Sequence, residues 1–277
     1  MPADASGAGG TGAPDNPWSD EPGPIWEPPS DPLAAIAATA PETPASALRA
    51  KAVSEVSPDE TEHRNVTHVV TFEDESQAVY KPAEGERPGN FRDIPDTEMW
   101  LREVAVGYVD SLLHFDLVPT TSEWSGRYGI GSLQEWRDAH PGHLDIDSYD
   151  RIDVERMAVL DYICGNTDRH SGNYLTDPET GRPVAIDHGR AFPEFADAPI
   201  RSEFIARCLN QTLSDEVVAA VRAVDVSIFR AVLNASGLGT GAVDGAVARL
   251  TEVQQLGRID GSGWPGQIMD ANQVVVR

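Results

Sequence analysis

Cysteine is scarce in this chain: its 277 residues include two thiols, at Cys164 and Cys208. Both lie in apolar helical patterns, which is typical of small buried hydrophobic residues, and they fit neither a disulfide framework nor a zinc site. The N-terminus lacks a basic region followed by an apolar run, and no apolar stretch is long enough to span a bilayer. These absences predict a cytoplasmic protein without stable membrane insertion.

Basic residues are also few, with 21 Lys and Arg against 45 Asp and Glu and a formal net charge of −24. Such a surface repels phosphate backbones and anionic lipid headgroups. We therefore expect no nucleic-acid partner and no electrostatic docking on membranes. The hydrophobic content of 40% is ordinary for a soluble protein, and the length suits one large domain or two lobes.

The first part of the chain, residues 1–45, is rich in Pro, Gly and Ala and holds too little apolar surface to offset the entropy of ordering. We predict a disordered tail there. Its exceptions are Trp18, Trp26 and the apolar patch at residues 33–36, which could dock on the folded part or on a partner. A loosely held tail is the simpler expectation.

The most informative stretch is residues 164–192, CGNTDRHSGNYLTDPETGRPVAIDHGRAF. Asp168 is followed five residues later by Asn173, and Asp187 ends an apolar run. Phosphoryl transfer needs a carboxylate that orients or deprotonates the attacking hydroxyl, and oxygen ligands that hold magnesium. Asp168 is thus the candidate catalytic residue, with Asn173 and Asp187 as metal ligands. Clusters of Asp, Asn and Gly are ordinarily turns. The order of the two loops, together with an upstream lysine, nevertheless favours a kinase-type site here.

These residues carry a family resemblance. N-T-D-R-H-x-x-N followed by I-D-H-G resembles the catalytic and metal loops of the phosphatidylinositol 3- and 4-kinase superfamily. It is also similar to the loop of HipA-type Ser/Thr kinases and to small actinobacterial PI3/4-kinase family proteins, over residues 66–192. The resemblance implies ATP and Mg²⁺ (or Mn²⁺) as cofactors. It also implies that His170 supports Asp168 or the transferring phosphate, with a histidine bonded to a backbone carbonyl as the alternative.

The fold class that the resemblance implies is α+β, a two-lobed protein-kinase-like fold. A small, mainly β N-lobe would span residues 46–136 and a helical C-lobe residues 137–277. Strand patterns at residues 65–72 and 77–81 suit the N-lobe, and Lys81 would end the strand that carries the phosphate-pairing lysine. The loop at residues 57–64 departs from kinases, because it has three carboxylates and no glycine.

A helix is predicted at residues 97–114, with Asp96 as a plausible N-cap, in the place of the kinase αC helix. Glu103 lies at the family-like position for pairing with Lys81, and Glu98 is the competing candidate. Strands are expected at residues 117–121 and 128–135. By order and resemblance, backbone groups of Gln134, Glu135 and Trp136 would then meet the adenine.

The rest of the chain reads as helical. We predict a helix at residues 150–164 with one buried stripe, and further helices at 201–209, 214–224, 228–236 and 241–257. The last 20 residues would form a tail that docks or frays.

The expected reaction is transfer of the γ-phosphoryl of ATP to a hydroxyl, with protein Ser or Thr as the preferred acceptor. A lipid acceptor, a small-molecule acceptor and transfer of AMP are alternatives. A catalytically weak kinase-like scaffold is a further one. The glycine-free loop favours the scaffold, whereas the set of Lys81, Asp168, Asn173 and Asp187 disfavours it.

Overall fold

Five antiparallel strands form a sheet in the order β1-β2-β3-β5-β4. Its strands are β1 (Val53–Pro58), β2 (His68–Phe72), β3 (Gln77–Pro82), β4 (Thr121–Gly126) and β5 (Gly129–Glu135). Burial alternates with period two along β2 and β3, as in strands with one face in a core. On one face Phe72, Tyr80 and Leu133 form a small core with Leu48 of helix α2 (Pro44–Ala50). Lys81, which pairs with Ser132 in the register, belongs to the opposite face.

The computed structural model describes residues 43–59, 65–87, 98–139, 145–195, 198–270 and 272–277. All described elements belong to one unit, residues 40–277. Most of the predicted tail lies outside the described residues, and so do Trp18, Trp26 and the apolar patch at residues 33–36. Residues 44 and 45, which we assigned to that tail, instead form the first turn of α2, capped by the Thr43 hydroxyl. The limits of the two lobes stay a prediction.

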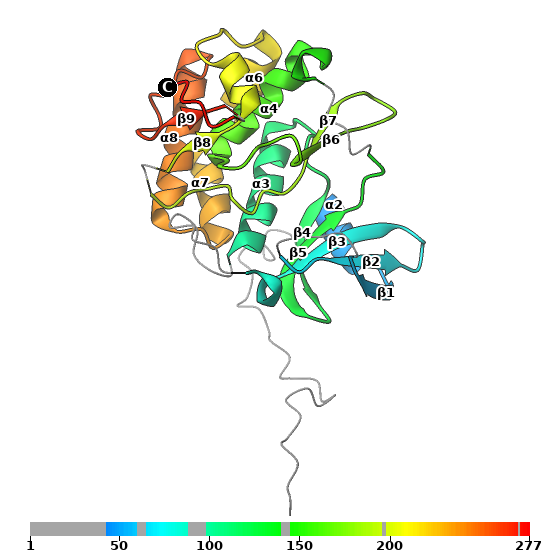
Figure 1. Cartoon of the computed structure of the whole chain (residues 1–277). Coiled ribbons are helices and arrows are strands. Elements are labelled where there is room, and N and C mark those ends of the chain that lie inside the picture. The colour runs from blue at the N-terminus through cyan, green and yellow to red at the C-terminus, as the bar shows by residue number, and fades with distance from the viewer. Residues whose placement is uncertain (1–42, 60–64, 88–97, 140–144, 196–197, 271) are drawn as a thin grey trace, which may run out of the picture. The chain divides into compact units, whose positions relative to one another are not determined.

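Helix α3 (Met99–Leu113) packs against β4 and β5 on one side and against α4 and α7 on the other (Figure 1). Its first N–H groups, those of Met99 and Trp100, donate to the Glu86 carboxylate at 2.9 and 2.7 Å. The predicted N-cap, Asp96, lies outside the described residues, and the N-cap position is Glu98, without a side-chain bond. Glu86 caps the helix instead and fixes it to the chain that leaves β3.

The remaining helices gather at the other end of this unit (Figure 1). They are α4 (Arg151–Cys164), α5 (Glu203–Cys208), α6 (Asp215–Ala223), α7 (Val226–Ala235) and α8 (Thr240–Leu256). The single buried stripe predicted for the first of them is wrong, because every residue of α4 from Asp153 to Cys164 except Arg156 is buried. Because α4 is enclosed on all sides at the centre of the larger core, a prediction from one apolar face underestimates how many of its residues are buried.

Two short hairpin partners, β6 (Tyr174–Thr176) and β7 (Pro183–Ala185), carry the motif loops. The 3₁₀ turns are η1 (Ala83–Gly85) and η2 (Ile146–Ser148). The strand expected at residues 117–121 is wrong for residues 117–120, which the structure describes outside any strand, because β4 begins at Thr121. The N–H groups of Leu117 and Val118 bond instead to the buried Asp110 carboxylate.

The C-terminal segment docks rather than frays. Strand β9 (Ile268–Met269) pairs in parallel with β8 (Ile200–Arg201). Trp264 is 2% exposed, and its indole N–H donates to the Ala198 carbonyl at 3.0 Å. This segment therefore supports the chain that follows the metal loop. Among the described residues, none of the helices combines the length and apolarity that crossing a bilayer requires.

Candidate active site

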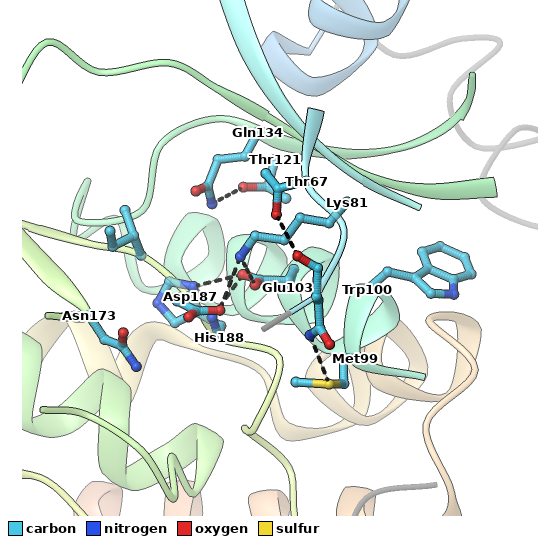
Figure 2. A network of polar contacts seen from close by, with 12 residues as sticks. Thr67, Lys81, Met99, Trp100, Glu103, Thr121, Gln134, Asn173, Asp187 and His188 are labelled. Atoms are coloured by element: carbon cyan, nitrogen blue, oxygen red, sulfur yellow. Dashed lines mark hydrogen bonds and ion pairs between the residues drawn. The ribbon is translucent and has the colours of Figure 1, made fainter. Parts of the chain in front are cut away.

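Lys81 is the centre of a cluster of charged side chains between the sheet and α3. Its Nζ lies 2.6 Å from Glu103 Oε1 and 3.0 Å from Asp187 Oδ1 (Figure 2). The expected pair of Lys81 and Glu103 is thus present. The competing Glu98 instead lies 3.7 Å from Arg102. One ammonium group bridges a carboxylate on α3 to a carboxylate on the loop after β7.

Burial and charge oppose each other in this cluster. Burial of Lys81 would lower its pKa, but the adjacent Asp187 and Glu103 carboxylates outweigh it and raise the pKa above its usual 10.5. Burial would raise the pKa of Glu103, yet the Lys81 charge and the bond from His188 hold that pKa below its usual 4.5. Lys81 and Glu103 are therefore both ionised at neutral pH.

Glu103 also positions the metal loop. Its Oε2 accepts the His188 N–H at 2.8 Å, and the His188 imidazole lies 3.4 Å away. Burial lowers the pKa of His188 below its ordinary value, which keeps the ring neutral beside Glu103. Asp187 itself adopts a φ of 56° and leaves its side chain 54% exposed. The strand β7 thus ends in a left-handed turn that presents the carboxylate to solvent.

The catalytic loop is tied to the metal loop through the main chain. Ile186 N–H donates to the Asn173 carbonyl at 3.2 Å. The Asn173 side-chain N–H donates to the Asp168 carbonyl at 2.9 Å, and the Asp168 N–H donates to Asn166 Oδ1 at 2.9 Å. Because the Asn173 amide nitrogen is occupied, its oxygen is the atom that can bind a cation. Figure 2 places Asn173 on the same side of the cluster as Asp187.

A buried ion pair, which sequence reasoning missed, holds these loops. Arg169 and Asp161 are 0% and 1% exposed, with Nε 3.0 Å from Oδ1. Arg169 also donates to the carbonyls of Ile186 and Asn173, the latter through a very short contact. Ser202 Oγ donates to Asp161 Oδ2 at 2.7 Å. An Asp inside the apolar pattern of α4 was the available signal, since a buried carboxylate needs a partner.

Two further arginines contact Asp168, and these too were missed. Asp168 Oδ1 lies 3.0 Å from Arg190 Nη1 and 3.6 Å from Arg201 Nη1. His170, by contrast, turns to its own loop, where Nδ1 accepts the Gly172 N–H at 3.0 Å. The ring thus bonds to a backbone N–H, whereas the alternative expected a backbone carbonyl, and the supporting role of His170 stays a prediction.

The adenine contacts predicted at Gln134, Glu135 and Trp136 stay a prediction, and the fold restricts which backbone groups could make them. Gln134 lies inside β5, between β3 and β4, and its side chain donates to Thr121 Oγ1 at 2.9 Å. The N–H groups of Glu135 and Trp136 already donate to Thr120 and Gln77 carbonyls. Both side chains line a pocket of about 390 Å³ with Leu48 of α2 and Lys51, the residue that caps the C-terminal end of α2. An adenine contact at these residues would therefore have to use backbone groups other than the N–H groups of Glu135 and Trp136.

Comparisons with known proteins fit this geometry. The family model "Phosphatidylinositol 3- and 4-kinase" matches residues 109–205. Protein Rv2133c of Mycobacterium tuberculosis is 31% identical over 148 residues, 40% of this chain and 52% of that protein. Phosphatidylinositol 4-kinase gamma 1 of Arabidopsis thaliana is 31% identical over 140 residues, 41% of this chain and 25% of that protein. The chain thus spans about half the length of one relative and a quarter of the other.

A solved structure extends the likeness to most of the chain. The Golgi casein kinase with Mn/ADP bound superposes with a TM-score of 0.52 at 17% identity, covering 79% of this chain and 76% of that one. At this identity the likeness establishes the fold alone. The predicted α+β, protein-kinase-like fold is confirmed, and so is the PI3/4-kinase-like character of the motif region.

Proposed function

Because this chain is phosphatidylinositol 3/4-kinase-like over residues 109–205, we propose that it is a kinase that transfers the γ-phosphoryl of ATP to a hydroxyl acceptor. One observation carries the proposal: a single lysine, Lys81, lies within 3.0 Å of both the α3 glutamate and the metal-loop aspartate. These groups come from elements far apart in sequence. Structural ion pairs seldom coincide with a motif that independently predicts the same three residues.

The residues present suit a nucleotide with a divalent cation. The Asp187 carboxylate is half exposed and Asn173 has its amide oxygen available, which gives two hard oxygen ligands. Mg²⁺ or Mn²⁺, when bound there, supplies charge neutralisation on the phosphates. Lys81 holds the phosphates, and Glu103 keeps the lysine in one orientation. Asp168 orients the acceptor hydroxyl and accepts its proton.

A protein Ser or Thr is the proposed acceptor. The net charge of −24 supports this choice over an inositol lipid, because lipid acceptors lie in anionic membranes that repel such a surface. The plant relatives named phosphatidylinositol 4-kinases favour the lipid, so vesicles belong in the same assay. Mass spectrometry of the modified acceptor distinguishes transfer of phosphate from transfer of AMP, because the two groups add different masses.

The experiment follows labelled phosphate from ATP into protein and lipid acceptors with Mg²⁺ or EDTA. Asp187→Asn removes a metal-binding charge, and we expect a loss of transfer of at least about a hundredfold without unfolding. Asp244→Asn, which changes an exposed aspartate paired with Arg230, is the matched control and should leave transfer intact. Near wild-type transfer by the Asp187→Asn protein would refute the assignment.

A further inference from the structure

A pocket of about 390 Å³ lies beside α2, at the ends of the neighbouring strands β3 and β5. Gln77 at the start of β3 and Glu135 at the end of β5 both line it. The described residues of its lining do not include Lys81, Glu103 or Asp187. The pocket is therefore distinct from the charged cluster of the candidate active site.

Carboxylates dominate the charge of this pocket. Three of them line it, those of Glu75, Glu135 and Asp138. Lys51 is the basic residue among the described residues of the lining. Its Nζ lies 2.8 Å from Oδ2 of Asp74, so a carboxylate outside the lining already compensates the charge of this lysine.

The excess of negative charge remains when the neighbouring charges are included. Arg137 follows the lining residue Trp136, and its Nη2 lies 3.4 Å from Glu135 Oε2. With Asp74 and Arg137 added, four carboxylates are set against two cations, which leaves two net negative charges. The chain before α2, residues 1–43, contains no Lys or Arg side chain to offset them. The pocket thus suits a cationic ligand.

Trp136 adds an aromatic ring to these charges. The residue is 40% exposed, and its indole N–H donates to Asp138 Oδ1 at 3.1 Å. The face of an aromatic ring attracts cations, and indole does so most strongly. The pocket therefore combines an aromatic platform with carboxylates in one small volume.

The backbone fixes both sides of the pocket. The Trp136 N–H donates to the Gln77 carbonyl at 3.0 Å, which ties the residue after β5 to β3. Glu75 adopts a φ of 67° in the turn between β2 and β3, where its N–H donates to the Phe72 carbonyl at 3.0 Å. Backbone hydrogen bonds at the end of the sheet thus hold the aromatic ring and the acidic turn in place.

We propose that this pocket binds an arginine side chain from a basic segment of a partner protein. The planar guanidinium stacks on an indole and binds carboxylates through its fork of N–H groups. Ala47 and Leu48 also line the pocket, and their apolar surface suits the methylene stem that arginine buries beneath its charged head. The inference goes beyond the proposed kinase function and does not depend on it.

Charge complementarity decides between the classes of occupant. Nucleic acids and anionic lipids have the same sign of charge as the pocket and as the chain, whose formal net charge is −24. An uncharged apolar segment would leave the carboxylates of the lining without a cation. A basic protein segment is attracted by the whole chain at long range and by the pocket at contact.

NMR titration of the isotope-labelled protein tests the proposal, because it measures weak binding and reports where the ligand lies. The peptides are otherwise uncharged and differ at one central residue, which is Arg, Lys, Gln or Leu. The indole N–H resonance of Trp136, identified by its absence from Trp136→Phe, should shift when the arginine peptide is added. That peptide should bind at least about tenfold more tightly than the glutamine peptide, which corresponds to about 1.4 kcal/mol, and the lysine peptide should lie between them.

Glu75→Gln and Asp138→Asn remove one charge each and should each weaken binding of the arginine peptide about threefold or more. Together they should bring the ratio of the arginine and glutamine affinities close to one. Glu216→Gln and Asp244→Asn are the matched controls, because they remove the same charge from α6 and α8, and they should leave the ratio unchanged. All four side chains are exposed, so none of these changes should impair folding.

Equal binding of the arginine and glutamine peptides by the wild type would overturn the proposal. So would equal weakening by the control variants, since that result means that the net charge attracts basic peptides without a site. Tighter binding of the leucine peptide would assign the pocket to an apolar segment instead. Self-association that Glu75→Gln and Asp138→Asn abolish would assign it to a second copy of the chain, which also contradicts the proposal. Because these measurements involve no ATP, failure of the kinase proposal leaves them unaffected.

Discussion

Replacement of Glu103 by Gln tests the charged cluster most sharply. Glu103 is 4% exposed and accepts hydrogen bonds from Lys81 Nζ at 2.6 Å and from the His188 N–H at 2.8 Å. The amide oxygen of Gln can still accept the bond from His188. The principal loss is therefore the charged bond to Lys81, which remains 24% exposed, so water relieves part of the penalty.

The expected loss in the free energy of unfolding is about 2 kcal/mol, within the range for a hydrogen bond to a charged group. For a domain of this size it corresponds to a fall in Tm of about 4–8 °C. Glu98→Gln is the matched control, because Glu98 lies 3.7 Å from Arg102 on the same helix and is 33% exposed. That change should cost less than about 1 kcal/mol.

The pKa shifts of Glu103 and Lys81 fix the pH range over which the stabilities of the wild type and Glu103→Gln should differ. The pKa of Glu103 is held below its usual 4.5 in the folded protein, so its contribution is present above that pH and is lost as the pH falls through the folded value. The pKa of Lys81 is raised above 10.5, so its contribution persists below that pH and is lost only as the pH rises through the folded value. Urea unfolding of wild type and Glu103→Gln should thus differ by a constant amount from about pH 5 to 10 and converge in acid. Equal costs for the Glu98 and Glu103 variants would refute the reasoning.

Two further predictions concern buried titratable groups. Burial raises the pKa of Asp110 to about 7. The wild type should therefore lose stability relative to Asp110→Asn as the pH rises from about 4 to 7, with no further loss above pH 7. A difference in the free energy of unfolding that does not change with pH would contradict this prediction. Burial also raises the pKa of Cys208 to about 12 and that of Cys164 well above its usual value, so both thiols should react with a thiol reagent only after denaturation, and rapid labelling of the native protein would refute their burial.

The sequence predicted what its motifs encode locally. Lys81, Glu103, Asn173 and Asp187 could be proposed as site residues because strand ends, helix phase and loop spacing are local patterns, and resemblance supplied their order. Arg190 and Arg201 were missed because their approach to Asp168 depends on how residues 187–202 fold back along the catalytic loop. No periodicity of the chain records such a contact.

The errors and the open points have similar causes. Asp96 was chosen as N-cap by its residue type, but the Glu86 carboxylate, 13 residues before Met99, provides the cap through tertiary structure. Backbone groups of Gln134, Glu135 and Trp136 were placed at the adenine by order and resemblance, and the structure leaves fewer of them available, because the Glu135 and Trp136 N–H groups already donate to carbonyls. Whether the C-terminal segment docks or frays was left open, because its docking depends on a parallel pairing between β8 and β9 that local propensity does not reveal.

The central claim is that side chains from four separate elements surround one triphosphate and its cation. A crystal structure of the protein with Mn²⁺ and a non-hydrolysable ATP analogue tests it directly, because anomalous scattering locates the metal. We expect the metal bound by the Asp187 carboxylate and the Asn173 amide oxygen, with Lys81 Nζ against the phosphates. A nucleotide bound elsewhere, or a metal ligated by other residues, would contradict the account.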